Sequence, residues 1–223
     1  MDSKVSVLQL DTQFPRVPGD VASADSYTGE LEIIRIPNAS VSKIVTHLPH
    51  QIDITPFEKA IESASGDVIV TSCGFLSFWQ NHLEKLTQKP FISSALTAFK
   101  TLSEQFAPEE VLTLTFDDES LTPEHFGSYS AYATNSIGLP HSMHLRRVIS
   151  ENRKSLDVNL AQQELIEFIS SKRRPHHKHM VLECTNLPPY AKALRDATGL
   201  GITHILSCVD KQLPGSVQTK FLS

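Results

Sequence analysis

Two cysteines in this chain stand where buried strands are predicted to end. Cys73 follows the apolar run at 68–70, and Cys184 follows the apolar run at 180–182. Such runs between helical patterns are typical of parallel strands, whose carboxyl ends share one edge of the sheet and bind ligands there. Helix-like sequence follows each cysteine, and a helix N-terminus favours the thiolate over a thiol of ordinary pKa, about 8.5. The pattern therefore predicts two reactive thiols that face one ligand.

A pair of opposed thiols suits the removal and return of a proton on a carbon next to a carboxylate. One thiolate takes the proton from one face, and the opposite thiol returns a proton on the other face. Hydroxyl and amide groups beside the thiols, together with the N–H groups of the turns, can bind the carboxylate and stabilise the developing charge; these residues are Thr71, Ser72, Thr185 and Asn186. This chemistry requires no cofactor. Structural cysteines and a single nucleophile remain the alternatives at this point.

The composition limits the class of protein. The 223 residues are 40% hydrophobic and 20% charged, which predicts a packed globular core. Twenty Lys and Arg against 25 Asp and Glu give a formal charge of -5, which argues against a general nucleic-acid surface. No signal-peptide pattern is present, and no apolar run approaches the roughly 18 residues that span a bilayer. The three cysteines, Cys73, Cys184 and Cys208, form no C-x-x-C pair. Their spacing fits neither a disulfide framework nor a metal site. Because disulfide frameworks belong to oxidising compartments, we expect a cytoplasmic protein.

Alternating strand and helix patterns predict an α/β fold of two similar lobes, each a parallel sheet flanked by helices. Residues 1–95 with the C-terminal tail 207–223 are predicted to form the first lobe, and residues 96–206 the second. Thr55 is expected to cap a helix over 55–63. The predicted strands are 5–10, 31–36, 68–71, 91–93, 111–116, 131–137, 180–182 and 202–206, and the further helices are 75–87, 95–105, one from 122, 143–151, 157–171 and 188–198.

Three segments of the chain resemble the aspartate/glutamate racemase family. They are VLECTNLPPY at 181–190, TSCGFL at 71–76 and LDTQFPRVPGD at 10–20, and the likeness covers nearly the whole chain. The resemblance is to a branch apart from the aspartate, glutamate and hydantoin racemases themselves. It implies pseudo-symmetric lobes with the active site between them. It also implies acid and base roles for Cys73 and Cys184 on a substrate such as an amino acid, without pyridoxal phosphate or metal.

The resemblance also places individual residues. Asp11 matches the acidic residue that ends the first strand near the reacting centre, and the loop with Asp117 is placed beside the substrate. Gly74 and Phe75 follow the first thiol where the racemases themselves usually carry Asn and Thr, and Asn186 stands where a glutamate racemase has His. We therefore expect Phe75 to narrow the pocket or make it more apolar, and the identity of the substrate stays open.

These observations predict an isomerase, a cofactor-independent amino-acid racemase or epimerase with Cys73 and Cys184 as acid and base. The alternatives are a one-cysteine decarboxylase or isomerase of dicarboxylic acids on the same fold, and a small-molecule-binding relative without turnover. The expected partner is a small molecule with a carboxylate, with no nucleic acid and no membrane; a homo-oligomer is left open. Arg16, in the loop after the first strand, is a candidate partner for the carboxylate. The predicted substrate-binding residues are Asp11, Arg16, Thr71, Ser72, Gly74, Phe75, Asp117, Thr185 and Asn186.

Overall fold

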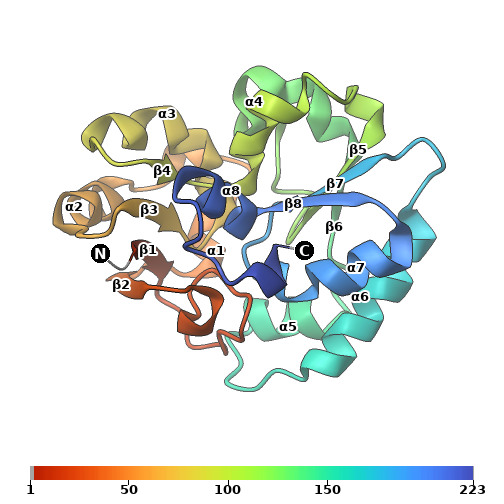
Figure 1. The fold of residues 1–223 in the computed structure, drawn as a ribbon, viewed down its shortest axis with the longest axis horizontal. Coiled ribbons are helices and arrows are strands. Elements are labelled where there is room, and N and C mark those ends of the chain that lie inside the picture. Colours follow the sequence, from red (N-terminus) through yellow and green to blue (C-terminus); the bar gives the residue numbers. More distant parts are fainter. Residues whose placement is uncertain (1–2, 223) are drawn as a thin grey trace.

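The chain folds into two parallel sheets with helices around them, which confirms the predicted α/β class (Figure 1). The computed structural model describes residues 3–222. The first sheet has the strand order β2-β1-β3-β4 and the second the order β6-β5-β7-β8. The strands are β1 (Lys4–Leu10), β2 (Glu30–Ile36), β3 (Val68–Thr71), β4 (Phe91–Ile92), β5 (Val111–Thr115), β6 (Ser136–Gly138), β7 (His179–Leu182) and β8 (Gly201–His204).

Short helices connect these strands. The α-helices are α1 (Val41–Ile44), α2 (Thr55–Ser63), α3 (Gln80–Leu83), α4 (Phe99–Leu102), α5 (His144–Ser150), α6 (Val158–Lys172), α7 (Ala191–Thr198) and α8 (Ile205–Gln212). Segments of 3₁₀ helix are Ala24–Ser26, Pro49–Gln51, Gly74–Trp79, Glu84–Leu86, Ala95–Ala98, Pro108–Glu110, Pro123–Asn135, Pro188–Tyr190 and Thr219–Phe221. None of the helices within residues 3–222 combines the length and apolar character that crossing a membrane requires.

The two sheets are built on the same plan, and this places the two cysteines in equivalent positions. In each sheet the first strand lies between the second and the third, so β3 and β7 correspond. Cys73 follows β3 by two residues, and Cys184 follows β7 by two residues. The residue before each cysteine also makes the same ladder contact, since the N–H of Ser72 donates to Leu8 and the N–H of Glu183 donates to Leu114.

Four of the predicted helices are interrupted or of the 3₁₀ type in the structure: the helix predicted from 122 is the kinked 3₁₀ segment Pro123–Asn135, and the helix over 188–198 begins with the 3₁₀ turn Pro188–Tyr190 before α7. The segment predicted as a helix over 75–87 is a 3₁₀ helix up to Trp79, followed by α3 and another 3₁₀ turn. Tertiary contacts override helix propensity here. The indole N–H of Trp79 donates to the carbonyl of Pro49, and the side chain of Gln80 bonds to the backbone of Phe91 and of Ser93. The predicted helix over 95–105 likewise begins with a 3₁₀ segment before α4.

Three element boundaries also differ from the prediction. Thr55 is the first residue of α2 rather than its cap, because the carboxylate of Asp53 accepts the N–H of Thr55 at 3.1 Å. The predicted strand over 131–137 is limited to β6, since 3₁₀ helix extends to Asn135. The predicted strand over 202–206 ends at His204, whose ring accepts the N–H of Ser207 and begins α8.

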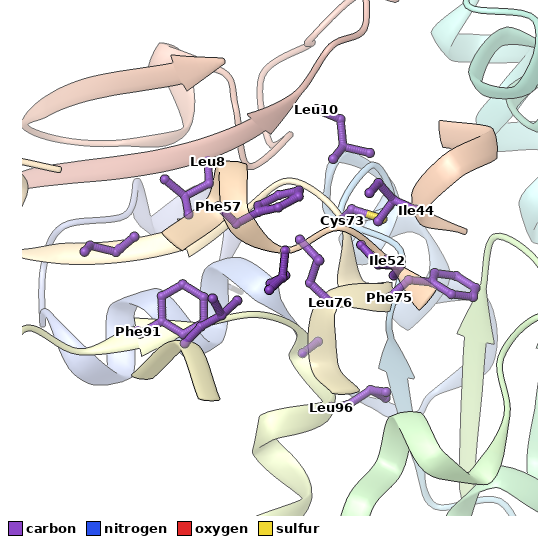
Figure 2. Close-up of a cluster of buried hydrophobic side chains, with 14 of the residues drawn as sticks. Leu8, Leu10, Ile44, Ile52, Phe57, Cys73, Phe75, Leu76, Phe91 and Leu96 are labelled. Carbon is purple, nitrogen blue, oxygen red and sulfur yellow. The ribbon is translucent and has the colours of Figure 1, made fainter. Parts of the chain in front are cut away.

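Helix α8 returns the C-terminal part of the chain to the first sheet. In Figure 1 it lies between the two sheets, and it contacts β3 and β4. Its buried residues Ile205, Leu206 and Val209 belong to one apolar cluster with residues of β1 and β3. Cys208 is in this cluster too, whereas Cys73 lies in a different cluster of the first lobe, close to Leu10 and Ile44 (Figure 2). The exact boundaries of the lobes stay a prediction.

Candidate active site

Cys73 and Cys184 line the same cavity, which lies where the carboxyl ends of β3 and β7 meet. The cavity is small in the free protein, with a volume of about 30 Å³. Six of the predicted substrate-binding residues also line it, namely Arg16, Ser72, Gly74, Phe75, Thr185 and Asn186. The two thiols therefore share one site, as their positions in the two equivalent sheets require.

Hydrogen bonds between the lobes hold the two strand ends together. The hydroxyl of Thr185 donates to the carbonyl of Ser72 at 2.6 Å, across a sequence separation of 113 residues. The amide of Asn186 donates to the carboxylate of Asp20 at 2.6 Å. The hydroxyl of Ser72 in turn accepts the N–H of Leu10. Thr185 and Ser72 thus tie the two strand ends together at the cavity.

The predicted lowering of the thiol pKa values is wrong. Burial and the carboxylate of Glu183 raise the pKa of Cys73 to about 12 and raise that of Cys184 further. The N–H groups of Phe75 and Asn186 donate to the two sulfurs and lower the pKa values, but burial outweighs them. The segment after Cys73 begins as a 3₁₀ helix, and the segment after Cys184 begins four residues later at Pro188, so neither cysteine lies at the first turn of a regular α-helix. Both cysteines are therefore thiols in the free protein at neutral pH.

The surroundings of the two thiols differ in charge. Arg16 lowers the pKa of Cys73, whereas Cys73 and the carboxylate of Asp20 raise the pKa of Cys184. The thiol of Cys184 also points at the side-chain oxygen of Asn186, with 3.8 Å between the two atoms. Cys73 is therefore the thiol that ionises more readily.

Glu183 is a site residue that the sequence analysis did not select. Its side chain is fully buried and lines the cavity beside both cysteines. One carboxylate oxygen accepts the hydroxyl of Thr115 at 2.6 Å, while the other has no hydrogen-bond partner among the described residues. Burial raises the pKa of this carboxyl to about 7. The available signal was an acidic residue directly after three apolar strand residues, a position that normally buries its side chain.

Arg16 is the cation of the cavity wall. Its guanidinium bonds to the carboxylate of Asp20 at 3.2 Å and to the hydroxyl of Thr12 at 3.0 Å, and it lies over the ring of Phe14. Its Nε is buried and has no partner within residues 3–222. These contacts hold the guanidinium in place, and the Nε–H that lacks a partner among the described residues is a donor that a carboxylate can use.

Three predicted substrate-binding residues lie outside the cavity lining. The carboxylate of Asp11 is half-exposed and pairs with Arg35 at 3.3 Å. The hydroxyl of Thr71 donates to the carbonyl of Ser93 at 2.6 Å, below the sheet edge. Asp117 pairs with Arg146 at 3.3 Å and accepts the hydroxyl of Ser120. In each case the polar group forms an ion pair or a hydrogen bond with a neighbouring side chain or carbonyl instead of facing the cavity.

The remaining walls of the cavity are apolar, and most were not predicted. They comprise Leu10, Phe14, Val41, Val45, Phe75, Phe116 and Ile149. Low polarity around the thiols excludes water and strengthens every charge interaction inside the cavity. Within residues 3–222 no group of three or more His, Cys, Asp or Glu side chains is arranged to hold a metal ion.

Sequence comparison relates the chain to a group of lyases. No family model matches it. It is 26% identical over 92% of its length to dimethylsulfoniopropionate lyase 5 of Emiliania huxleyi (strain CCMP1516), and it spans 44% of that protein. It is 23% identical over 96% of its length to a dimethylsulfoniopropionate lyase of Durusdinium sp. clade D, and it spans 75% of that one. The chain thus matches about half to three quarters of the length of these curated relatives.

Structure comparison relates the fold to racemases. The allantoin racemase of Pseudomonas fluorescens superimposes with a TM-score of 0.59 at 9% identity, covering 96% of this chain and 93% of the other. The aspartate racemase of Picrophilus torridus gives a TM-score of 0.52 at 13% identity, covering 99% of this chain and 98% of the other. At these identities the likeness establishes the shared fold alone.

The prediction of an amino-acid racemase is therefore wrong. The resemblance to the racemase family holds for the fold, but the sequence relatives over more than nine-tenths of the chain are lyases rather than isomerases. The alternative of a one-cysteine decarboxylase or isomerase of dicarboxylic acids on the same fold agrees better with the relatives, because a decarboxylase is also a lyase.

Gly74 tests how closely Glu183 approaches the first thiol. A Cβ at position 74 would lie 2.1 Å from a carboxylate oxygen of Glu183 and 2.6 Å from its carbonyl oxygen. We expect Gly74→Ala to lower the free energy of unfolding by about 1–3 kcal/mol, as overpacking does, measured by urea denaturation. Combining it with Glu183→Ala should recover only part of the loss, because the carbonyl stays. Additivity of the two effects would contradict the contact.

Glu183 also predicts a pH dependence of stability. Its pKa is above the unfolded value of 4.5, so the folded state binds the proton more tightly and stability falls as pH rises from about 4.5 to about 7. Glu183→Gln should remove this loss and raise the free energy of unfolding at pH 8 by about 3 kcal/mol, with a much smaller gain at pH 5. The exposed Glu62→Gln is the control. Equal effects of Glu183→Gln at both pH values would contradict the assignment.

Proposed function

We propose that this protein is a lyase that cleaves dimethylsulfoniopropionate, or a closely similar sulfonium acid, by β-elimination. The observation that carries the proposal is the match of nearly the whole chain to several dimethylsulfoniopropionate lyases. The chain spans only part of each of these relatives. The proposal therefore also depends on the residues of this chain's own cavity.

The charges of the cavity support a zwitterionic substrate. Dimethylsulfoniopropionate carries a carboxylate at one end and a sulfonium cation at the other. Arg16 has a buried Nε–H without a partner among the described residues, which can serve the carboxylate, and the single negative charge that Glu183 and the thiols share attracts the sulfonium. Phe75 supplies aromatic surface for the methyl groups of the cation, whereas the rings of Phe14 and Phe116 already stack on the guanidinium groups of Arg16 and Arg146. Arg16 is neutralised by Asp20, so the lining favours a substrate with a positive group over a dianion.

The reaction requires one base. A cysteine thiolate takes the proton from the carbon next to the carboxylate, the carbon–carbon double bond forms, and the carbon–sulfur bond breaks. The bonding electron pair leaves with sulfur, so the products are neutral dimethyl sulfide and acrylate, and the proton stays on the thiol until solvent removes it. Arg16 and the N–H groups of the turns stabilise the charge that develops on the carboxylate.

The departing sulfide needs no proton, so a second acid on the opposite face of the carbon is unnecessary. Cys73 is the first candidate for the base, because Arg16 favours its thiolate whereas Asp20 opposes that of Cys184. In this reading the other thiol shapes the cavity and its charge balance.

Activity of the purified chain tests the proposal directly. We expect dimethyl sulfide in the headspace and acrylate in solution, in equal amounts, when the protein is incubated with dimethylsulfoniopropionate, as measured by gas and liquid chromatography. The double variant Cys73→Ser/Cys184→Ser should be inactive, and Cys208→Ser is the matched control because Cys208 lies in a separate apolar cluster. Absence of both products with folded protein would refute the proposal.

The single cysteine variants test the need for one base. We expect Cys73→Ser and Cys184→Ser to differ in kcat by at least about tenfold, because a base whose removal costs a general-base contribution of about 10²–10⁴ is present on one side only. Both variants are compared by initial rates of dimethyl sulfide release, after circular dichroism shows equal folding. Equal loss of activity in the two variants would show that both thiols take part in proton transfer.

A further inference from the structure

We propose that the carboxylate of Glu183 is the proton acceptor for the thiols of the cavity, so that one negative charge moves between the carboxylate and sulfur. The thiol S–H bond breaks, the carboxyl O–H bond forms, and a thiolate with a neutral carboxylic acid results. In the lyase proposed above, on which this role rests, that thiolate takes the proton of the substrate.

The position of Glu183 supports this role. The residue is fully buried, lines the cavity with Cys73 and Cys184, and directly precedes Cys184 in the chain. Only one of its carboxylate oxygens has a partner, the hydroxyl of Thr115. A buried carboxylate oxygen without a donor is costly, and the described residues provide none. Neither thiol donates to this oxygen in the free protein, where the thiol of Cys184 points at Asn186, so the transfer requires a thiol to turn toward Glu183.

A comparison of the two equivalent sheets shows that the chain lacks a side chain where the carboxylate of Glu183 lies. Gly74 and Thr185 are equivalent, since each follows its cysteine directly. The hydroxyl of Thr185 donates a hydrogen bond to the carbonyl of Ser72. Ser72 precedes Cys73 as Glu183 precedes Cys184, so these two residues are equivalent. Position 74 has no side chain, and a Cβ there would overlap with the carboxylate of Glu183. The carboxylate therefore occupies the place of a side chain next to the first thiol.

The charges around the cavity allow one negative charge at a time. Among the described residues, the titratable and charged groups near the thiols are Glu183, Asp20, Arg16 and Tyr190. Asp20 and Arg16 form an ion pair, and burial and Asp20 raise the pKa of Tyr190, which stays neutral. The charge of Glu183 raises the pKa of both thiols, so a thiol ionises more readily once this carboxyl is neutral, and burial raises the pKa of Glu183 to about 7, closer to that of the thiols than an ordinary carboxyl would be. Groups coupled in this way titrate together rather than one by one.

The test measures the pH dependence of thiol alkylation without any substrate. Wild-type protein is treated with iodoacetamide between pH 5 and pH 10, and labelling of Cys73 and Cys184 is followed by mass spectrometry. We expect the logarithm of the rate at one of them to rise with pH, to flatten near the titration of Glu183, and to rise again only in alkaline solution. In Glu183→Gln the rate should rise without that break, because no carboxylate takes the proton.

A second variant keeps the test independent of folding defects. Thr115→Val removes the hydrogen bond that lowers the pKa of Glu183, so the break should move to higher pH while the fold is kept. Absence of the break in wild-type protein, its persistence in Glu183→Gln, or an unmoved break in Thr115→Val would each overturn the proposal. Because no substrate is present, these outcomes are separate from the presence or absence of lyase activity.

Discussion

The hydrogen bond from the Thr185 hydroxyl to the Ser72 carbonyl joins the two halves of the site. Its donor and acceptor lie 113 residues apart in sequence and 2.6 Å apart in space, at the ends of two equivalent strands. Parallel sheets bring the carboxyl ends of their strands to one edge, but nothing in a single sheet fixes how two such edges meet. This bond and the one from Asn186 to Asp20 set that relation. Every distance between the thiols, Glu183 and Arg16 depends on it.

Where the two sheet edges meet, the burial of the cavity determines how easily its groups ionise. The walls are largely apolar, so a charge inside loses much of its solvation, and each ionisation raises the cost of the next. This explains why the pKa values of both thiols and of Glu183 are raised together, against the expectation of activated thiolates from the sequence. In the absence of a ligand, both cysteines therefore stay protonated. A ligand that brings a cation into the cavity lowers the cost of a thiolate there.

The sequence predicted the parts of the fold that depend on local pattern. The strand predicted over 68–71 agrees with β3 residue by residue, because four consecutive apolar or β-branched residues are typical of a strand that is buried on both faces. It also predicted that Cys73 and Cys184 follow strands. It did not predict where polar side chains point. Asp117 pairs with Arg146, and the buried carboxylate of Glu183 lies against Gly74, which has no side chain to exclude it. Both outcomes depend on residues distant in sequence.

The same two lobes can serve a racemase or a lyase because both reactions begin with removal of the proton next to a carboxylate. The two reactions differ in their second step. Inversion requires a proton from the opposite face, and hence two groups of matched acidity on the two sides. Elimination ends when the carbon–sulfur bond breaks, and a neutral sulfide needs no acid. In this cavity the two sides are unequal: Arg16 favours the thiolate of Cys73, Asp20 opposes that of Cys184, and Glu183 stands beside a glycine on one side only. An asymmetric site of this kind suits a reaction that uses one face of its substrate.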